Sequence, residues 1–225
     1  MHNLLKWLYK AVDIIFPKFC VVCKKEGKFL CDDCFRKIKI NNCPVFIFKE
    51  APVFNKFFIP CSYHKNDILK KGLHLMKYKF YKDLCGDLAP LIVDIFGKFP
   101  LPEGTILVPV PLHKKRLKYR GFNQSEEISK YIGGKLNLKV INLLIRERET
   151  ISQATLNREQ RLKNVNEAFK INPQISYDKN TPVLLIDDVC TTMSTIKSTA
   201  EVLQKNGFKT IMGSAIARAE LDKNL

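Results

Sequence analysis

The segment VLLIDDVCTTMSTI (183–196) carries side chains whose types and order suit a phosphorylated sugar. An apolar run ends in two adjacent acids, Asp187 and Asp188, and small hydroxyl residues then open a helical stretch. Ligands of open parallel sheets lie at the carboxyl ends of strands, where a helix N-terminus offers unpaired N–H groups to a phosphate. The acids would repel a phosphate but suit the hydroxyls of an attached ribose. The loop residues that would surround the phosphate are Thr191, Thr192, Met193, Ser194 and Thr195.

A second segment, HKKRLKYRGFNQ (113–124), carries five cations and no acid. It follows the apolar run ILVPV (106–110), so it would lie at the same sheet edge as the two acids. Arg116 and Arg120 are the first candidates for contact with a phosphate-rich ligand, because guanidinium binds phosphate in a bidentate fork. The alternative for any single residue is a solvated basic loop.

The cysteines near the N-terminus have the spacing of a metal site. The segment CVVCKKEGKFLCDDC (20–34) contains two Cys-x-x-Cys pairs separated by seven residues. Four thiolates arranged in this way can hold Zn²⁺ tetrahedrally, and they leave no open position for catalysis. We therefore predict a structural zinc site formed by Cys20, Cys23, Cys31 and Cys34. Cys43 is a reserve ligand, and the other cysteines (Cys61, Cys85 and Cys190) are expected to be buried, apolar thiols.

Periodicity supplies the elements that would position these groups. Apolar runs at 106–110, 183–187 and 211–217 predict buried parallel strands, and the stretches 125–136 and 195–207 predict helices between them. Gly207 is a suitable residue just past a helix end. We predict an N-terminal helix and zinc ribbon over 1–50 and an α/β domain over 63–225. Residues 51–62 form a linker or a strand entry, and the helix lies within 3–16.

The charge balance favours polyanionic partners. Lys and Arg total 38 against 22 acids, which gives a net charge of +16. A zone at 65–82 interleaves lysines, including Lys77 and Lys79, with aromatic residues such as Tyr78, a combination that suits single-stranded nucleic acid. The alternative is a helix whose aromatic side chains face the core. No apolar run approaches the roughly 20 residues needed to span a membrane.

The phosphate-loop segment resembles the phosphoribosyl-pyrophosphate (PRPP) motif of the type I phosphoribosyltransferases. In that motif the acids contact ribose hydroxyls, and the following loop holds the 5′-phosphate. Met193 departs from it, because glycine is usual at this position; if φ is positive there, methionine costs about 1 kcal/mol or more. An ordinary strand-to-helix junction capped by Asp and Thr is the alternative.

The resemblance narrows to the ComF competence family. It is carried by VPVPLHKKRLKYRGFNQS (108–125), by RERETISQATLNREQRLKNVNEAF (146–169), and by the N-terminal cysteine pairs. It implies that 110–124 form the pyrophosphate loop and the mobile loop that covers it, and that Mg²⁺ accompanies PRPP.

Two functions follow from this resemblance. In the first, the chain is a cytoplasmic competence protein that handles incoming single-stranded DNA and binds PRPP, with peripheral contact to the inner membrane or the DNA-uptake machinery. In the second, it is an active phosphoribosyltransferase with an unidentified acceptor, in which Asp187 and Asp188 stabilise an oxocarbenium-like transition state.

Overall fold

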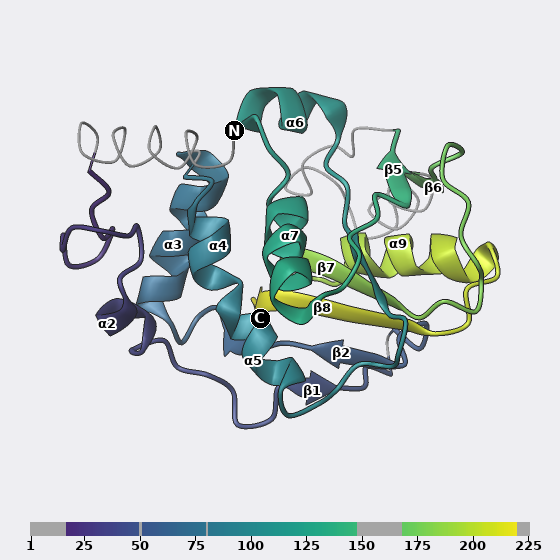
Figure 1. The fold of residues 1–225 in the computed structure, drawn as a ribbon, viewed down its shortest axis with the longest axis horizontal. Coiled ribbons are helices and arrows are strands. Elements are labelled where there is room, and N and C mark those ends of the chain that lie inside the picture. Colours follow the sequence, from purple (N-terminus) through teal and green to yellow (C-terminus); the bar gives the residue numbers. More distant parts are fainter. Residues whose placement is uncertain (1–16, 50, 80, 148–167, 220–225) are drawn as a thin grey trace, which may run out of the picture.

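The computed structural model describes residues 17–49, 51–79, 81–147 and 168–219 (Figure 1). The helix predicted within 3–16 and most of the family-like segment 146–169 lie outside the described residues. Within the described ranges, none of the helices has both the length and the apolar composition that crossing a bilayer requires.

A six-stranded, mostly parallel sheet forms the centre of the molecule. Its path runs β1-β2-β8-β7-β4, with β3 beside β8, and only the β1–β2 pair is antiparallel. The strands are β1 (Val45–Phe46), β2 (Lys56–Phe58), β3 (Cys61–Ser62), β4 (Ile106–Pro109), β7 (Val183–Cys190) and β8 (Ile211–Arg218). The predicted α/β core with a parallel sheet is thereby confirmed. Strands β1 to β3 precede residue 63 and still belong to this sheet.

Helices cover both faces of the sheet (Figure 1). One face packs against α3 (Asp67–Tyr78), α4 (Leu84–Leu88), α5 (Pro90–Phe96) and α7 (Gln124–Leu136), and the other against α9 (Ser194–Lys205). The smaller elements are α2 (Asp32–Phe35), α6 (Lys114–Arg120) and the antiparallel pair β5 (Leu144–Arg146) and β6 (Phe169–Ile171). The helices predicted at 125–136 and 195–207 are confirmed. Gly207 follows the C-cap of α9 with φ 91°, as expected of a residue just past the helix end.

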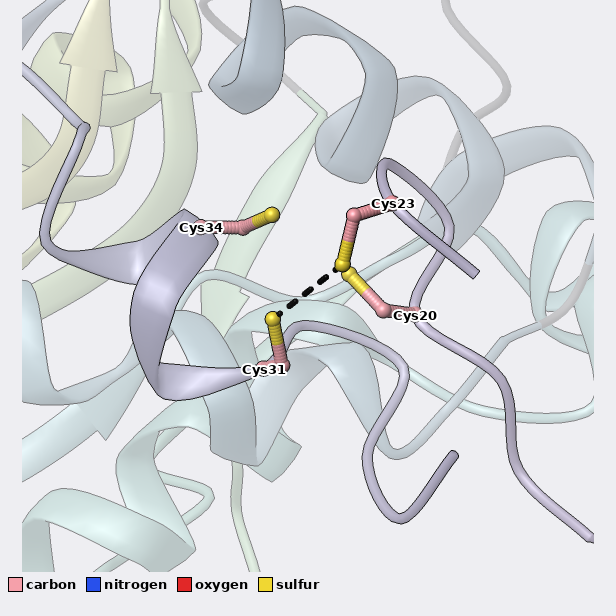
Figure 2. Close-up of side chains that lie close together, drawn as sticks. All are labelled: Cys20, Cys23, Cys31 and Cys34. Atoms are coloured by element: carbon pink, nitrogen blue, oxygen red, sulfur yellow. Dashed lines mark hydrogen bonds between the residues drawn. The ribbon is translucent and has the colours of Figure 1, made fainter. Parts of the chain in front are cut away.

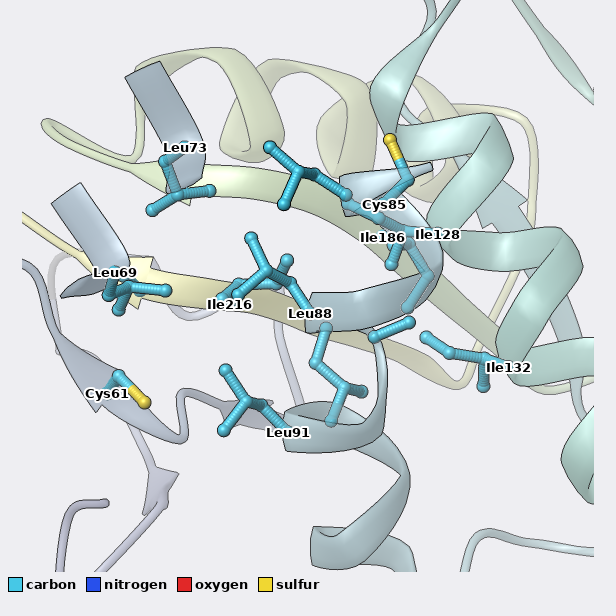
Figure 3. Packing of buried hydrophobic residues seen from close by; sticks show 14 of the residues in the cluster. Cys61, Leu69, Leu73, Cys85, Leu88, Leu91, Ile128, Ile132, Ile186 and Ile216 are labelled. Carbon is cyan, nitrogen blue, oxygen red and sulfur yellow. The ribbon is translucent and has the colours of Figure 1, made fainter. Parts of the chain in front are cut away.

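The two-sided covering explains the unbroken apolar run of β7. Leu184 and Ile186 point to the side of α3, α4 and α7, whereas Val183 and Leu185 point to the side of α9. Figure 3 shows the first of these clusters, in which Ile186 and Ile216 of the sheet meet Leu73 of α3 and other helical side chains. A strand buried on both faces needs apolar residues at successive positions, so alternation is absent.

One strand is longer than the sequence predicts. The prediction ends the strand at Asp187, but β7 continues to Cys190, which is paired with Arg218 of β8. The acids therefore lie within a hydrogen-bonded strand and not after it. Backbone pairing does not depend on side-chain polarity, so two acids did not end the ladder once β8 continued alongside.

The cysteine-rich segment shares its core with the sheet. Leu30, Cys34 and Ile38 belong to the same buried cluster as Leu69 of α3. The N–H of Leu30 also donates to Oδ2 of Asp87 on α4 at 3.0 Å. The cysteine-rich segment is thus tied to the helical face of the α/β core.

Candidate functional site

The acid pair is held by α7 as well as by β7. Oδ1 of Asp187 accepts from Oγ of Ser125 at 3.0 Å and from the backbone N–H of Asp188 at 2.9 Å. Ser125 lies in the first turn of α7, whose N-cap side chain, Asn123, accepts from the Ser125 N–H at 3.1 Å and donates to the Val110 carbonyl at 3.0 Å. The end of β4, the start of α7 and the acids of β7 are therefore joined at one sheet edge.

The pKa of the Asp187 carboxyl group is strongly shifted by its surroundings. Burial and the neighbouring charge of Asp188 raise the pKa of Asp187 to about 7, although Lys77 and the hydrogen bonds from Asp188 and Ser125 oppose the rise. Two adjacent carboxyl groups in a poorly solvated place cannot easily ionise together. Asp187 can therefore gain or lose a proton near neutral pH.

Asp188 is paired with a lysine of α3. Nζ of Lys77 lies 2.9 Å from Oδ1 of Asp188, and the N–H of Val189 donates to the same oxygen at 2.6 Å. Burial alone would lower the pKa of Lys77, but the charge and hydrogen bond of Asp188 outweigh it, so that the pKa is raised. Lys77, which the sequence groups with the other lysines of 65–82, therefore lies against the acids in the structure. Lys77 is directed at the acids.

Arg120 of α6 also interacts electrostatically with Asp188. It ends α6, it is half-buried, and among the residues that the structure describes its Nε has no hydrogen-bond partner. Burial lowers the pKa of Arg120, whereas the negative charge of Asp188 opposes that change. Arg116, one turn earlier, is exposed. The loop predicted at 110–124 contains the helix α6: the His113 side chain caps this helix, and Gly121, with φ 79°, follows its last residue.

The hydroxyl loop joins β7 to α9. Thr191 and Thr192 are exposed, Ser194 and Thr195 are half-buried, and the hydroxyls of Thr192 and Ser194 lie 2.8 Å apart. Ser194 is the first residue of α9, so the N-terminus of that helix opens into the loop. The sequence-predicted residues of this loop thus lie together at the end of β7.

Met193 has the backbone conformation that glycine adopts most readily. Its φ is 57° and its ψ is −5°, in the left-handed region. The positive φ considered from the sequence is therefore present. The side chain is only 5% exposed and packs in the cluster that includes Ile196 and Ala200. Apolar burial offsets the strain of this conformation.

A small cavity lies beside the acids, between α3 and the hydroxyl loop. Its volume is about 200 Å³. The lining residues are Tyr63, Leu73, His74, Lys77, Tyr78, Val189, Thr191 and Ala219. We call this space the α3 cavity. Sequence reasoning did not find it, because its walls come from four separate segments that only the fold brings together.

The four predicted zinc ligands converge (Figure 2). Their Sγ atoms lie within 4.8 Å of one another, and those of Cys23 and Cys31 are 3.5 Å apart. Tetrahedral Zn–S bonds of about 2.3 Å place sulfur atoms about 3.8 Å apart, so the group fits a metal ion with little movement. Burial opposes ionisation of Cys20, but backbone N–H groups of Cys23 and Cys31 lower its pKa to about 6. Cys43, the reserve ligand, is exposed and lies outside the group.

The remaining cysteines behave as predicted. Cys61, Cys85 and Cys190 are at most 2% exposed. Burial raises the pKa of each of these thiols to about 12. They are apolar parts of the core.

Relatives of the chain carry names that refer to competence and to DNA utilization. Competence protein F of Haemophilus influenzae is 28% identical over 213 residues, which span 91% of this chain and 86% of that protein. DNA utilization protein YhgH of Escherichia coli O157:H7 is 30% identical over 210 residues, 88% of this chain and 89% of that protein. The chain belongs to the ComF family. Competence protein ComFC of Streptococcus pneumoniae, another of its relatives, is 26% identical over 212 residues, 87% of this chain and 90% of that protein.

Other comparisons are less informative for this ComF-family chain. No protein-family model matches it. Among solved structures, adenine phosphoribosyl transferase from Trypanosoma brucei is similar with a TM-score of 0.38 and 15% identity, over 67% of this chain and 71% of that chain.

Proposed function

We propose that this chain binds PRPP at the edge of the sheet and single-stranded DNA on adjacent basic surfaces, as a cytoplasmic protein of natural transformation. The observation that carries the proposal is the acid pair near the end of β7, which is followed two residues later by the hydroxyl loop at the N-terminus of α9. The competence and DNA utilization names of its relatives support the cellular role.

In this proposal each part of PRPP meets a group of suitable charge. Asp187 and Asp188 accept from the ribose hydroxyls, and the loop 191–195 donates to the 5′-phosphate. Arg120, whose Nε lacks a hydrogen bond among the described residues, is placed to contact the pyrophosphate, with the exposed Arg116 behind it. Mg²⁺ would accompany PRPP and neutralise part of the pyrophosphate charge.

The cysteine site is proposed to hold zinc in a structural role. All four ligand positions are occupied by thiols, and the site shares a buried cluster with α3 and α4. A metal at this position would therefore stabilise the region from which Lys77 reaches the acids.

The DNA-binding surface is proposed to comprise the exposed cations of α3 and α6. Lys71 and Lys79 are exposed on and just after α3, and α6 exposes Lys114 and Lys118. Tyr78 is 56% exposed and Tyr119 is 74% exposed, so each can stack on an unpaired base. Lys77 is excluded from this surface because it contacts Asp188.

A salt titration of oligonucleotide affinity tests this surface. For single strands, log K should fall with log salt at about −0.7 per phosphate contact, because each contact releases counterions. We expect Lys71→Glu/Lys79→Glu and Lys114→Glu/Lys118→Glu to weaken binding and to flatten the salt dependence. The matched control, Lys98→Glu/Lys205→Glu, makes the same change in net charge on exposed lysines elsewhere. Equal weakening in all three variants would contradict a defined surface.

The α3 cavity favours an active phosphoribosyltransferase as a second candidate function. It adjoins Thr191 of the loop and Lys77 beside the acids, where a small acceptor could approach the ribose. At about 200 Å³ it is smaller than the pockets of about 300–1,000 Å³ that hold drug-sized ligands, so it fits a single small ring system. Pyrophosphate release from PRPP, measured with a panel of bases, amines and nucleic acids, tests this function. Absence of release with every acceptor would leave PRPP as a ligand only.

A further inference from the structure

Lys77 occupies a position on α3 that the helical period assigns to the core. Leu69 and Leu73 lie eight and four residues before it, on the same face of the helix, and both are buried (Figure 3). The Lys77 side chain is itself only 25% exposed, and its Asp188 partner is 11% exposed. A lysine withdrawn from solvent in this way requires a compensating charge, which Asp188 supplies.

The charges around the acid pair make this contact important. Four titratable or charged groups surround Asp188. They are Lys77 of α3, Asp187 of the same strand, Arg120 of α6 and the neutral thiol of Cys85 on α4. Asp187 interacts electrostatically with Asp188 and Lys77, and its other neighbours are the Ser125 hydroxyl and the neutral thiol of Cys190. Among the described residues, Lys77 is the cation in direct contact with either acid.

We propose that Lys77 is a positioning residue of the PRPP site, which holds the Asp188 carboxylate in one orientation so that the ribose hydroxyls meet two fixed acceptors. This role rests on the proposed binding of PRPP. It divides α3 into two parts, because Lys71 and Lys79 serve the DNA-binding surface whereas Lys77 serves the acids. The N–H of Val189 fixes the same Asp188 oxygen from the strand side, so the carboxylate is held from two directions.

Removal of the Lys77 charge should raise the pKa of Asp187 further, because Lys77 opposes the rise that burial and Asp188 cause. An opposite charge within about 4–6 Å typically shifts a carboxyl pKa by 1–3 units, and adjacent acids titrate as a coupled pair. At neutral pH the pair would then be less ionised than in the wild type. PRPP affinity would be lost at neutral pH and regained at higher pH.

The experiment is calorimetry of Mg²⁺–PRPP binding from pH 6 to pH 9 with four variants. Lys77→Gln and Lys77→Met remove the charge, and the methionine keeps the apolar stem in case glutamine disturbs folding. Lys77→Arg restores the charge. Lys98→Gln changes an exposed lysine outside the two basic surfaces and reports the titration of PRPP itself.

We expect the midpoint of the pH dependence to move up by about one unit or more in Lys77→Gln and Lys77→Met, relative to Lys98→Gln. At pH 7 the affinity of these two variants should fall about tenfold, and the deficit should close towards pH 9. Lys77→Arg should keep the wild-type midpoint. An unchanged midpoint in both charge-removing variants, or a deficit equal at every pH, would overturn the role.

The two proposals fail in different ways. A wild-type protein that shows no heat of PRPP binding would refute the proposed function. Carbon NMR titration of the aspartate carboxyl groups needs no ligand and still tests Lys77. A carboxyl midpoint at Asp187 that is the same in the wild type and in Lys77→Met would overturn the role of Lys77 even where PRPP binds.

Discussion

Asp187 places a partly buried carboxyl group beside a second acid, which lowers the stability of the fold. The pKa of Asp187 is raised to about 7 in the folded protein by burial and by Asp188, against about 3.9 in an unfolded chain. The folded state therefore binds more protons than the unfolded state between about pH 4 and pH 7, so the stability from this group falls as pH rises through that window. Above about pH 7 the carboxyl group is ionised in both states, and its contribution to the free energy of unfolding falls no further.

Asp187→Asn should stabilise the protein, and more so at high pH. The asparagine Oδ1 can still accept from Ser125 and from the Asp188 N–H, but it carries no charge. We expect a gain of about 1 kcal/mol or more at pH 8, a rise in melting temperature of about 2–4 °C, and little gain near pH 4. Thermal unfolding of the wild type and the variant between pH 4 and pH 8 measures this gain in stability, with Asp94→Asn at an exposed position as the control. A gain that does not grow with pH would show that the Asp187 charge costs the fold nothing.

Met193→Gly separates backbone strain from burial at the hydroxyl loop. Glycine relieves the positive φ of 57°, which is worth about 1 kcal/mol. It also removes a buried methionine side chain worth about 1.5–3 kcal/mol and makes the unfolded chain more flexible. We therefore expect a net loss of about 1–2 kcal/mol in urea unfolding, with PRPP affinity nearly unchanged. Increased stability would mean that the strain of the left-handed backbone exceeds the stabilisation from the buried Met193 side chain.

At the scale of the element, the cysteine-rich segment should depend on its metal. Purified protein should contain one zinc ion per chain, and Cys20→Ser or Cys34→Ser should lower zinc content and melting temperature together, because the site shares its buried cluster with Leu30 and Ile38. Cys43→Ser is the matched control, since this exposed thiol lies outside the group. Zinc content that falls equally in all three variants, or in none, would contradict the assignment.

Elements with a strong apolar pattern could be predicted from the sequence. The runs at 106–110, 183–187 and 211–217 became β4, β7 and β8, and the helix predicted at 195–207 became α9, with Ile196, Ala200 and Leu203 buried along one stripe. The four cysteines were predictable because their spacing alone defines a chelating group. Each of these features is encoded locally, so no knowledge of distant contacts is needed.

Features that depend on distant neighbours were not predictable. The helix α6 has no buried residue and no apolar stripe, so KKRLKYR read as a loop, although Lys, Arg and Leu are good helix formers. Lys77 was indistinguishable from the other lysines of 65–82 until the fold brought it to Asp188. A lysine at the period of Leu69 and Leu73 was the available signal, and it marks a cation on an otherwise apolar face.

At the scale of the whole molecule, a chain with a net charge of +16 keeps two acids at the end of a central strand. Cations of α3 and α6 act on that site, Lys77 by direct contact with Asp188 and Arg120 through its electrostatic interaction with the same acid. The proposed DNA-binding surfaces lie on the same two helices. A ligand at the sheet edge and a ligand on these helices would therefore interact with neighbouring charges of the same two helices.

Binding of PRPP to the acid pair is the central claim, and a thermal-shift measurement with Mg²⁺ and PRPP tests it most directly. A ligand that binds only the folded state stabilises it by about 2.7 kcal/mol at one hundred times its Kd, which for a chain of this size raises the melting temperature by about 5–10 °C. We predict this rise for the wild type and no rise for folded Asp187→Ala/Asp188→Ala protein. An equal rise in the double variant would contradict the assignment of the acids to the ribose of PRPP.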